Sequence, residues 1–550
     1  MTPPLASRPT TNPGRGSNVA NTSKPSGLGR LFIRKSVEQM HAEHAQGELK
    51  KTLGPLNLIF LGIGCIIGTG IFVLTGRAAA EFAGPGIMIS FVITGTLCAL
   101  VALSYAELAS AIPVSGSAYS YSYASMGELV AWVMGLLLVL EYGLAASTVA
   151  VGWSGYTVSL LADLGVHIPA ALTAAPGVPV TDHDTGAVIA TGIVNLPAII
   201  GLAAVTTLLV VGISESAIVN NVIVFIKVGV VIAFIVIGAG YVNTDLWTPL
   251  IPEQIPAPPP GTDMSIWAQI GRALGGVLTG ADTGQYGVPG LITGAATIFF
   301  AYIGFEAVST AGAESKNPGR DMPIGILGSL IICTILYILT CAVLVGIVPY
   351  QQLDNPAPIA LAVDAIGLPW FAFVVKLGAF AGLSSVMLVL LYGQTRIFYT
   401  MAKDGLIPQV FANVHPKLQT PWINTILVGI LAMGFAGFMG LDALANLTNV
   451  GTLAAFSIVC ITVVYLRYAR PNINRPFKTP LFPITPILGA LMCIFLLMSL
   501  MAHDATRNFF LIYLGGGFLL YFVYGMWNSK LGKGIVVTGV EQPNPVQPNQ

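Results

Sequence analysis

Long apolar stretches, separated by short polar or glycine- and proline-rich segments, recur along the whole chain after about the first 50 residues. A helix needs about 20 apolar residues to cross about 30 Å of hydrocarbon, and twelve stretches approach or exceed that length. The pattern therefore predicts an all-α integral membrane protein with 12 transmembrane helices. The expected spans cover residues 56–79, 86–112, 128–160, 194–213, 217–240, 288–314, 324–348, 370–399, 422–440, 443–467, 482–502 and 508–527.

Glycines interrupt the first expected span. Gly68 and Gly70 flank Thr69 within the apolar run of residues 61–76. A glycine inside a helix costs about 1 kcal/mol relative to alanine, so this cluster predicts a break in the helix. A broken helix exposes backbone donors and acceptors, which a membrane tolerates only where they are buried in protein or line a cavity. The run is therefore a candidate binding site.

A second interrupted span lies five spans later, in residues 295–308, with a glycine at Gly304. It runs in the opposite direction to the first because the offset between them is odd. Two inverted halves that each begin with an interrupted helix are typical of secondary transporters, whose site lies near the middle of the membrane. The expected organisation is a cytoplasmic tail (1–50) with an interfacial helix (31–40), a first repeat (51–240), an extracellular loop (241–287), a second repeat (288–467), two further spans (468–527) and a cytoplasmic tail (528–550).

Composition and charge agree with this interpretation. The chain is 55% hydrophobic and only 9% charged, which excludes an ordinary soluble domain. Of the 24 Lys and Arg residues, 19 fall on the side of the N-terminus when the loops are assigned alternately to the two sides. The positive-inside rule then places both termini in the cytoplasm and supports an even number of spans.

Little in the chain suggests enzymatic chemistry. All six cysteines fall inside expected spans and are interpreted as small apolar packing residues, and all six histidines lie in tails or loops. No metal spacing, catalytic nucleophile or phosphate-binding loop stands out. We therefore expect no enzyme, no metal, no organic cofactor and no nucleic-acid partner.

Three ionisable residues lie well inside expected spans: Glu141 in the third, Lys227 in the fifth and Glu306 in the sixth. Inserting each costs at least about 2.5 kcal/mol, so such residues usually face the interior of the helix bundle and are functional. A lysine buried in this way can gain and lose a proton, as a proton-coupled carrier requires. The alternative is that Glu141 and Lys227 form a purely stabilising ion pair. Glu107 lies near the cytoplasmic end of the second span, where a solvated or capping role or a place in an inner gate are both open.

These residues together resemble the amino acid, polyamine and organocation (APC) superfamily of transporters, specifically the bacterial members of its cationic amino acid transporter branch. The resemblance covers nearly the whole chain from about residue 31 to the twelfth span. The matching segments are residues 64–76, 105–108, 113–119, 151–156, 299–306, 314–323, 395–408 and 475–480.

The resemblance implies the LeuT-like inverted-repeat fold, in which spans 1–5 and 6–10 form two intertwined halves with discontinuous helices 1 and 6. It also implies where the substrate's backbone groups bind. The α-carboxylate would lie against the N–H groups of Thr69 and Gly70, with Gly68 giving close access, since a helix N-terminus attracts anions. The α-ammonium would face the carbonyl groups around the two breaks, those of Ile66, Phe300 and Ile303, with Ala301 among these substrate-binding residues.

By the same resemblance, Glu141, Phe300 and the eighth-span segment 384–387, which ends at Met387, would line the side-chain pocket. Lys227 aligns with a lysine that replaces a sodium ion in the family, so it would be the proton-coupling residue. Phe300, Glu306 and Glu107 are the candidate gating residues.

The sequence thus predicts a proton-coupled L-amino acid symporter in the bacterial inner membrane, working by alternating access with the proton as coupling ion. An amino acid exchanger of the same fold is the alternative, and a membrane-bound amino acid sensor is a more remote one. Cationic and neutral substrates both stay open, because a free Glu141 carboxylate would favour Arg or Lys and pairing with Lys227 would cancel that preference. Besides the lipid bilayer, a small membrane subunit is a further possible partner on which the sequence is silent.

Overall fold

The computed structural model describes residues 31–35, 52–114, 116–181, 188–212, 217–255, 266–279 and 285–534. Most of the expected tails 1–50 and 528–550, residues 36–40 of the expected interfacial helix and parts of the loop 241–287 lie outside these residues. Residues 31–35 themselves begin with a single short helical turn.

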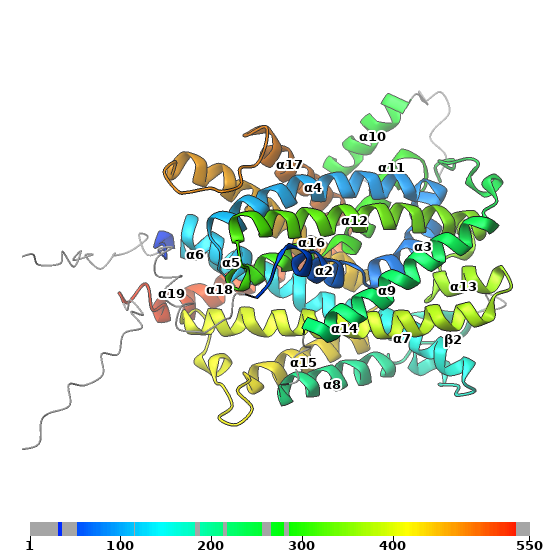
Figure 1. Cartoon of the computed structure of the whole chain (residues 1–550), viewed down its shortest axis with the longest axis horizontal. Coiled ribbons are helices and arrows are strands. Elements are labelled where there is room, and N and C mark those ends of the chain that lie inside the picture. Colours follow the sequence, from blue (N-terminus) through cyan, green and yellow to red (C-terminus); the bar gives the residue numbers. More distant parts are fainter. Residues whose placement is uncertain are drawn as a thin grey trace, which may run out of the picture.

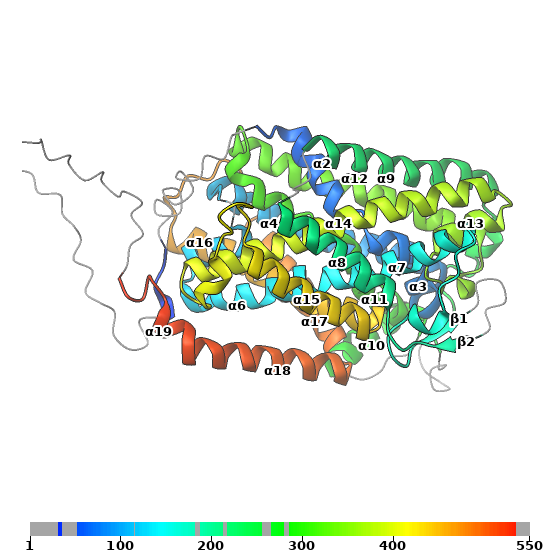
Figure 2. The same ribbon diagram turned by 90° about the horizontal axis from the view of Figure 1, so that it is seen from below.

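The described chain is a bundle of long apolar helices whose axes run broadly along one direction (Figures 1 and 2). It contains nine helices long and apolar enough to cross a membrane, and three shorter apolar helices, Pro55–Ile66, Leu196–Val211 and Trp422–Phe438. The protein is therefore a helical multi-pass membrane protein. One of the nine, Gly70–Ala111, holds parts of two expected spans, so the count of twelve stays a prediction.

The named strands of the described chain form one small antiparallel hairpin, β1 and β2, between the third and fourth expected spans, and its other named elements are helices and helical turns. This hairpin and the short helices α5 and α13 are not foreseen by the hydropathy pattern. The helices outside the two interrupted spans are α4 Ile87–Ala111, α5 Ser117–Ser125, α6 Glu128–Leu138, η5 Val139–Leu144, α7 Ala145–Asp163, α8 Leu196–Val211, α9 Ala217–Gly238, α10 Ile266–Thr279, α12 Pro318–Ile347, α13 Pro358–Ala365, α14 Pro369–Lys403, α15 Trp422–Phe438, α16 Leu441–Ala469, α17 Ile484–Met501, α18 Asp504–Leu520 and α19 Met526–Asn528. The strands are β1 Pro179–Thr181 and β2 Val188–Thr191, and single turns are η4 Gly84–Gly86, η6 Ala170–Leu172, η7 Ala239–Tyr241, η8 Thr244–Trp247, η11 Tyr350–Gln352, η12 Gln409–Ala412 and η13 Tyr521–Gly525.

The first expected span is built from four pieces. Helix α2 (Pro55–Ile66) starts with a proline in its first turn and ends where Ile67 turns to an extended conformation. The chain resumes a helical path with the π-turn η2 (Gly70–Leu74), α3 (Thr75–Ala78) and η3 (Ala79–Ala83). The predicted break at residues 68–70 is therefore confirmed, with its extended residue at Ile67.

The sixth expected span is interrupted as well. Helix α11 (Gly287–Ile298) tightens into the turn η9 (Phe299–Tyr302), and helical structure resumes as η10 (Glu306–Glu314). Gly304 lies between them with φ +121°, a backbone conformation that L side chains rarely adopt. The backbone conformation at this break therefore explains why a glycine occupies position 304.

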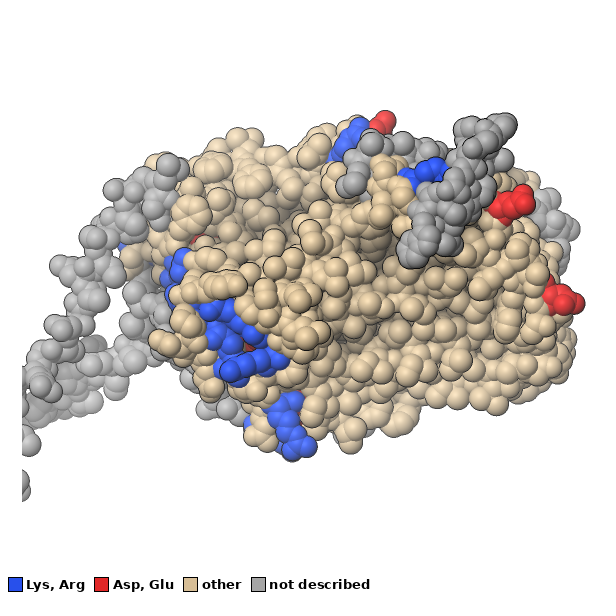
Figure 3. Space-filling model, turned by 90° about the horizontal axis from the view of Figure 1, so that it is seen from above, with Lys and Arg blue, Asp and Glu red and all other residues tan. Residues whose placement is uncertain are grey.

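The described ends of the chain meet at one end of the bundle (Figure 1). Ile33 accepts a hydrogen bond from the backbone N–H of Glu128 at 3.0 Å, and the Ser529 hydroxyl donates to the Glu128 carboxylate. Figure 3 shows lysines and arginines gathered toward this end and a broad uncharged surface along the bundle. An uncharged flank of this kind suits contact with lipid tails.

Candidate functional site

The two breaks touch each other in the middle of the protein. A β-carbon at Gly70 would overlap Cα of Ala301, and one at Gly304 would lie 2.8 Å from the carbonyl carbon of Cys65. Close backbone approach at both points requires glycine. The sequence-predicted residues Gly70 and Ala301 are therefore brought together by the fold.

The first break has backbone N–H groups without hydrogen-bond acceptors among the described residues. Within the described residues, the N–H groups of Gly68, Thr69 and Gly70 donate no hydrogen bond, because they open a new helical segment. The partial positive charge of a helix N-terminus adds to these donors and favours an anion such as a carboxylate. The Thr69 side chain is turned away from this group, since its hydroxyl donates to the carbonyl of Val149 at 3.4 Å.

Carbonyl groups at the other side of the first break are held by two side chains. The Lys227 ammonium donates to the carbonyl oxygens of Gly64 and, at 3.1 Å, Ile67. The Tyr337 hydroxyl donates to the carbonyl of Ile66 at 2.8 Å. Lys227 is fully buried, and its positive charge lies at the C-terminal end of α2, where a helix is partially negative.

The alternative ion pair between Glu141 and Lys227 is wrong. In the described part of the chain both carboxylate oxygens of Glu141 are buried without a hydrogen-bond partner, and Lys227 binds the α2 carbonyls instead. The hydropathy pattern correctly predicted that Lys227 lies inside the bundle. Its backbone partners lie 160 or more positions away along the chain, and no local pattern identifies them.

Glu141 lies beside Glu306. The two carboxyl groups are close enough to interact electrostatically, and Tyr105 and Tyr142 are close enough to interact with both of them. Among described residues, both Tyr hydroxyls and Oε1 of Glu306 also make no hydrogen bond although they are buried. Buried polar groups are normally paired, so this cluster can bind a proton, water or a cationic group. Tyr105 and Tyr142 were not identified from the sequence.

Glu306 also caps the second break. Its Oε2 accepts a hydrogen bond from the N–H of Gly304 at 2.8 Å, which satisfies one donor at the start of η10. The carbonyl of Phe300 accepts from the N–H of Ile303 at 3.2 Å, while that of Ile303 accepts none within the described residues. The Phe300 side chain is buried. The expected gating roles of Phe300 and Glu306 stay predictions.

Helix α14, in the eighth expected span, lies along the first break. A β-carbon at Gly68 would be 3.5 Å from Val386, and one at Gly382 would be 3.3 Å from the Lys227 side chain. Met387 is fully buried, but the residue of α14 beside Gly68 is its neighbour Val386. One position on a helix turns a side chain by about 100°, which the sequence alone did not resolve.

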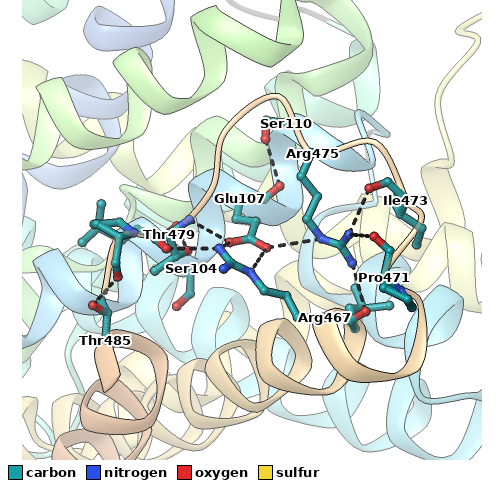
Figure 4. Close-up of polar contacts among 12 residues, drawn as sticks. Ser104, Glu107, Ser110, Arg467, Pro471, Ile473, Arg475, Thr479 and Thr485 are labelled. Carbon is teal, nitrogen blue, oxygen red and sulfur yellow. Dashed lines mark hydrogen bonds and ion pairs between the residues drawn. The ribbon is translucent and has the colours of Figure 1, made fainter. Parts of the chain in front are cut away.

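Glu107 belongs to a separate cluster (Figure 4). Its carboxylate is buried and accepts hydrogen bonds from Arg467 at 2.9 and 2.6 Å and from the N–H of Thr479 at 2.8 Å. Arg475 lies 3.5 Å from the same carboxylate. The expectation of a solvated or helix-capping side chain is therefore wrong, because Glu107 joins α4 to α16 and to the loop that follows it. Its gating role stays a prediction.

Arg77 forms a second ion-pair cluster, on α3, toward the end of the bundle away from the described termini (Figure 1). Its guanidinium lies 2.7 Å from Asp442 at the start of α16, 3.2 Å from Glu81 and 3.7 Å from Asp354. The cluster links the second half of the first interrupted span to the tenth expected span. From the sequence, Arg77 was only a charge that helped to set topology.

Comparison with known proteins gives concordant matches over most of the chain. A family model described as amino acid permease matches residues 53–523. The methylthioribose transporter of Bacillus subtilis (strain 168) is 43% identical over 506 residues, which cover 92% of this chain and 100% of that protein. The branched-chain amino acid permease BcaP of the same organism is 42% identical over 507 residues, with 92% and 100% coverage. The vacuolar cationic amino acid transporter 4 of Arabidopsis thaliana is 35% identical over 455 residues, with 81% and 68% coverage.

Proposed function

This chain belongs to the amino acid permease family, and we propose that it imports an L-amino acid together with a proton by alternating access. It is a transporter and not an enzyme. The observation that carries the proposal is the contact between two helix breaks that leaves backbone donors and acceptors unpaired on facing elements. An amino acid supplies the complementary pair of charges in every case, whatever its side chain.

The substrate's α-carboxylate binds the N–H groups of Gly68, Thr69 and Gly70. The α-ammonium binds the carbonyl of Ile303, with those of Ile66 and Phe300 as further acceptors. Each of the latter two has one donor already, and a carbonyl oxygen can accept two hydrogen bonds. The backbone of the transporter thus binds the α-carboxylate and α-ammonium groups that all α-amino acids share. The residues around the two breaks select the substrate by its side chain.

Proton coupling resides in Lys227. Protonated, its ammonium holds the end of α2 through the carbonyls of Gly64 and Ile67. A neutral amine would lose the charge that favours this position, so α2 would be free to move relative to α9. Proton and substrate then bias one conformational equilibrium, each through its own contacts with the first break.

Lys227→Ala in proteoliposomes tests the coupling. We expect loss of pH-gradient-driven accumulation and retention of counterflow, which needs no net proton movement. Lys417→Ala is the matched control, because Lys417 lies on an exposed loop. Undiminished gradient-driven accumulation by Lys227→Ala would overturn proton symport and favour the alternative of an amino acid exchanger. If the wild-type protein shows no counterflow at all, the remaining alternative is the amino acid sensor.

The substrate class needs its own experiment, because one relative is named a methylthioribose transporter. We expect thermal-shift measurements on the purified protein to show stabilisation by one or more of the twenty amino acids. Stabilisation by methylthioribose with no effect of any amino acid would overturn the amino acid proposal. The same screen separates cationic from neutral substrates.

The proposed topology has twelve spans in two inverted five-span repeats plus two further spans, in a bacterial inner membrane with both termini cytoplasmic. The meeting of the described chain ends at one end of the bundle supports it, because an even number of crossings returns the chain to its starting side. Reporter fusions at the N- and C-termini test it, and opposite locations of the two reporters would contradict it.

A further inference from the structure

Asn449, in α16, holds the truncated end of helix α11. Its side-chain Nδ2 donates to the carbonyl oxygens of Ala296 at 2.9 Å and Thr297 at 3.3 Å. These carbonyls belong to the last turn before the second break, where a helix leaves acceptors without partners of its own. Asn449 is fully buried, and within the described residues its Oδ1 makes no hydrogen bond, so only the donor half of the amide is used.

The same arrangement occurs at the first break, with a different side chain. Lys227 of α9 donates to the carbonyls of Gly64 and Ile67 at the end of α2. Helices α9 and α16 are the fifth and tenth expected spans, so they hold corresponding places in the two proposed halves. In each half, therefore, a polar side chain of the last helix donates hydrogen bonds to the backbone carbonyls at the end of the first helix, where the break begins.

The two side chains differ in the property that matters for coupling. An ammonium can lose its proton and with it the charge that holds α2, whereas a carboxamide does not titrate. One break can consequently be released by deprotonation, while the other keeps its geometry in every protonation state.

We propose that Asn449 is a positioning residue for the substrate, the permanently neutral counterpart of Lys227. By fixing the end of α11, it sets the direction of the turn η9 and of the carbonyl of Ile303 that receives the α-ammonium. This inference rests on the proposed function, since it concerns how the same site takes an amino acid.

The test uses the full-length purified protein and the amino acid that stabilises the wild type most. Asn449→Asp keeps the shape, and in its ionised form it removes the donor and brings oxygen against oxygen. Asn449→Leu keeps the branching at Cγ, with a larger side chain, and removes both polar atoms. Both are expected to raise the Kd about tenfold or more, because two buried carbonyls lose their partner. Asn446→Leu is the control, since Asn446 lies one turn earlier on α16 and is partly exposed.

Melting temperatures without substrate separate positioning from simple stability. A lowered melting temperature with an unchanged Kd would overturn the inference, because Asn449 would then only stabilise the fold. Asn449→Ser, which removes atoms and keeps a hydroxyl donor, covers the case in which the larger changes do not fold. Its affinity is expected between those of the wild type and Asn449→Leu, and wild-type affinity in Asn449→Ser together with Asn449→Leu would also overturn the inference.

Failure of the proposed function gives a different result. If no amino acid stabilises the wild type, the proposed function fails, and this inference fails with it. If the wild type binds an amino acid and Asn449→Leu binds it equally well, only the role of Asn449 is wrong.

Discussion

Gly70 lies directly against Ala301, so the two interrupted helices meet backbone to backbone at their breaks. A β-carbon on Gly70 would overlap Cα of Ala301 and stand 2.8 Å from its amide nitrogen. The atoms nearest to Gly70 belong to the backbone and β-carbon of Ala301, which cannot rotate away. A larger side chain at position 70 can therefore be accommodated only if the two helices move apart. This contact fixes the spacing between the unpaired donors of one break and the acceptors of the other.

Gly70→Ala is therefore expected to reduce amino acid uptake by at least about tenfold. Overpacking of a buried contact costs about 1–3 kcal/mol, and here the strain falls on the binding geometry itself. Uptake in proteoliposomes measures the effect. Gly434→Ala is the control, since a β-carbon added to Gly434 in α15 would have no neighbouring atom within 4 Å among the described residues. Equal uptake by the two variants would contradict the role of the contact.

Glu141→Gln is expected to weaken binding of cationic amino acids about 10- to 100-fold relative to neutral ones. The Glu141 carboxylate has no hydrogen-bond partner within the described residues and lies beside Glu306, so a cationic side chain would be its natural partner. Hydrogen bonds to charged groups contribute about 1.5–3 kcal/mol. Competition of lysine and leucine for the purified protein measures the ratio, and a ratio that stays the same would show that Glu141 takes no part in selection.

Glu107→Gln is expected to lower the free energy of unfolding by about 1–3 kcal/mol, because it removes the charge of a buried carboxylate that accepts hydrogen bonds from the partly exposed Arg467 and from the N–H of Thr479. Thermal melting in detergent measures the loss. Asp504→Asn removes one partner of the exposed Arg507 pair and should change stability by less than about 1 kcal/mol. A melting temperature of Glu107→Gln equal to that of Asp504→Asn would contradict a structural role for the cluster.

Asp442→Asn is expected to loosen the contact between α3 and α16 at Arg77. Ser384 is a partly exposed residue of α14, in the segment expected to line the side-chain pocket, and its hydroxyl accepts a hydrogen bond from Trp153. If the Arg77 ion pair restricts access to that pocket, a thiol placed there by Ser384→Cys should react about two- to fivefold faster with a membrane-impermeant reagent in Asp442→Asn, because a partly exposed ion pair contributes up to about 1 kcal/mol. Labelling that does not respond to Asp442→Asn would show that this ion pair does not control access.

The sequence predicted the class of protein and the positions of both helix breaks. Hydropathy and glycine content are local properties, so a membrane span and its interruption can be identified from about 20 neighbouring residues. Gly68, Gly70 and Gly304 were found in this way, and the structure places them at the contact of the two helices. The burial of Lys227 and Glu141 followed from the same local pattern.

Tertiary structure alone decided the partners of those residues. Lys227 pairs with carbonyls 160 or more positions away, Glu107 pairs with Arg467 across 360 positions, and Glu141 lies beside Glu306 and not beside Lys227. Val386 lay within the predicted segment 384–387 but was not singled out there, and Asn449 was missed because it does not stand out among the amide residues of its helix. A side chain's partner depends on which helices become neighbours and how each is rotated, and those are properties of the packed bundle, not of any one segment.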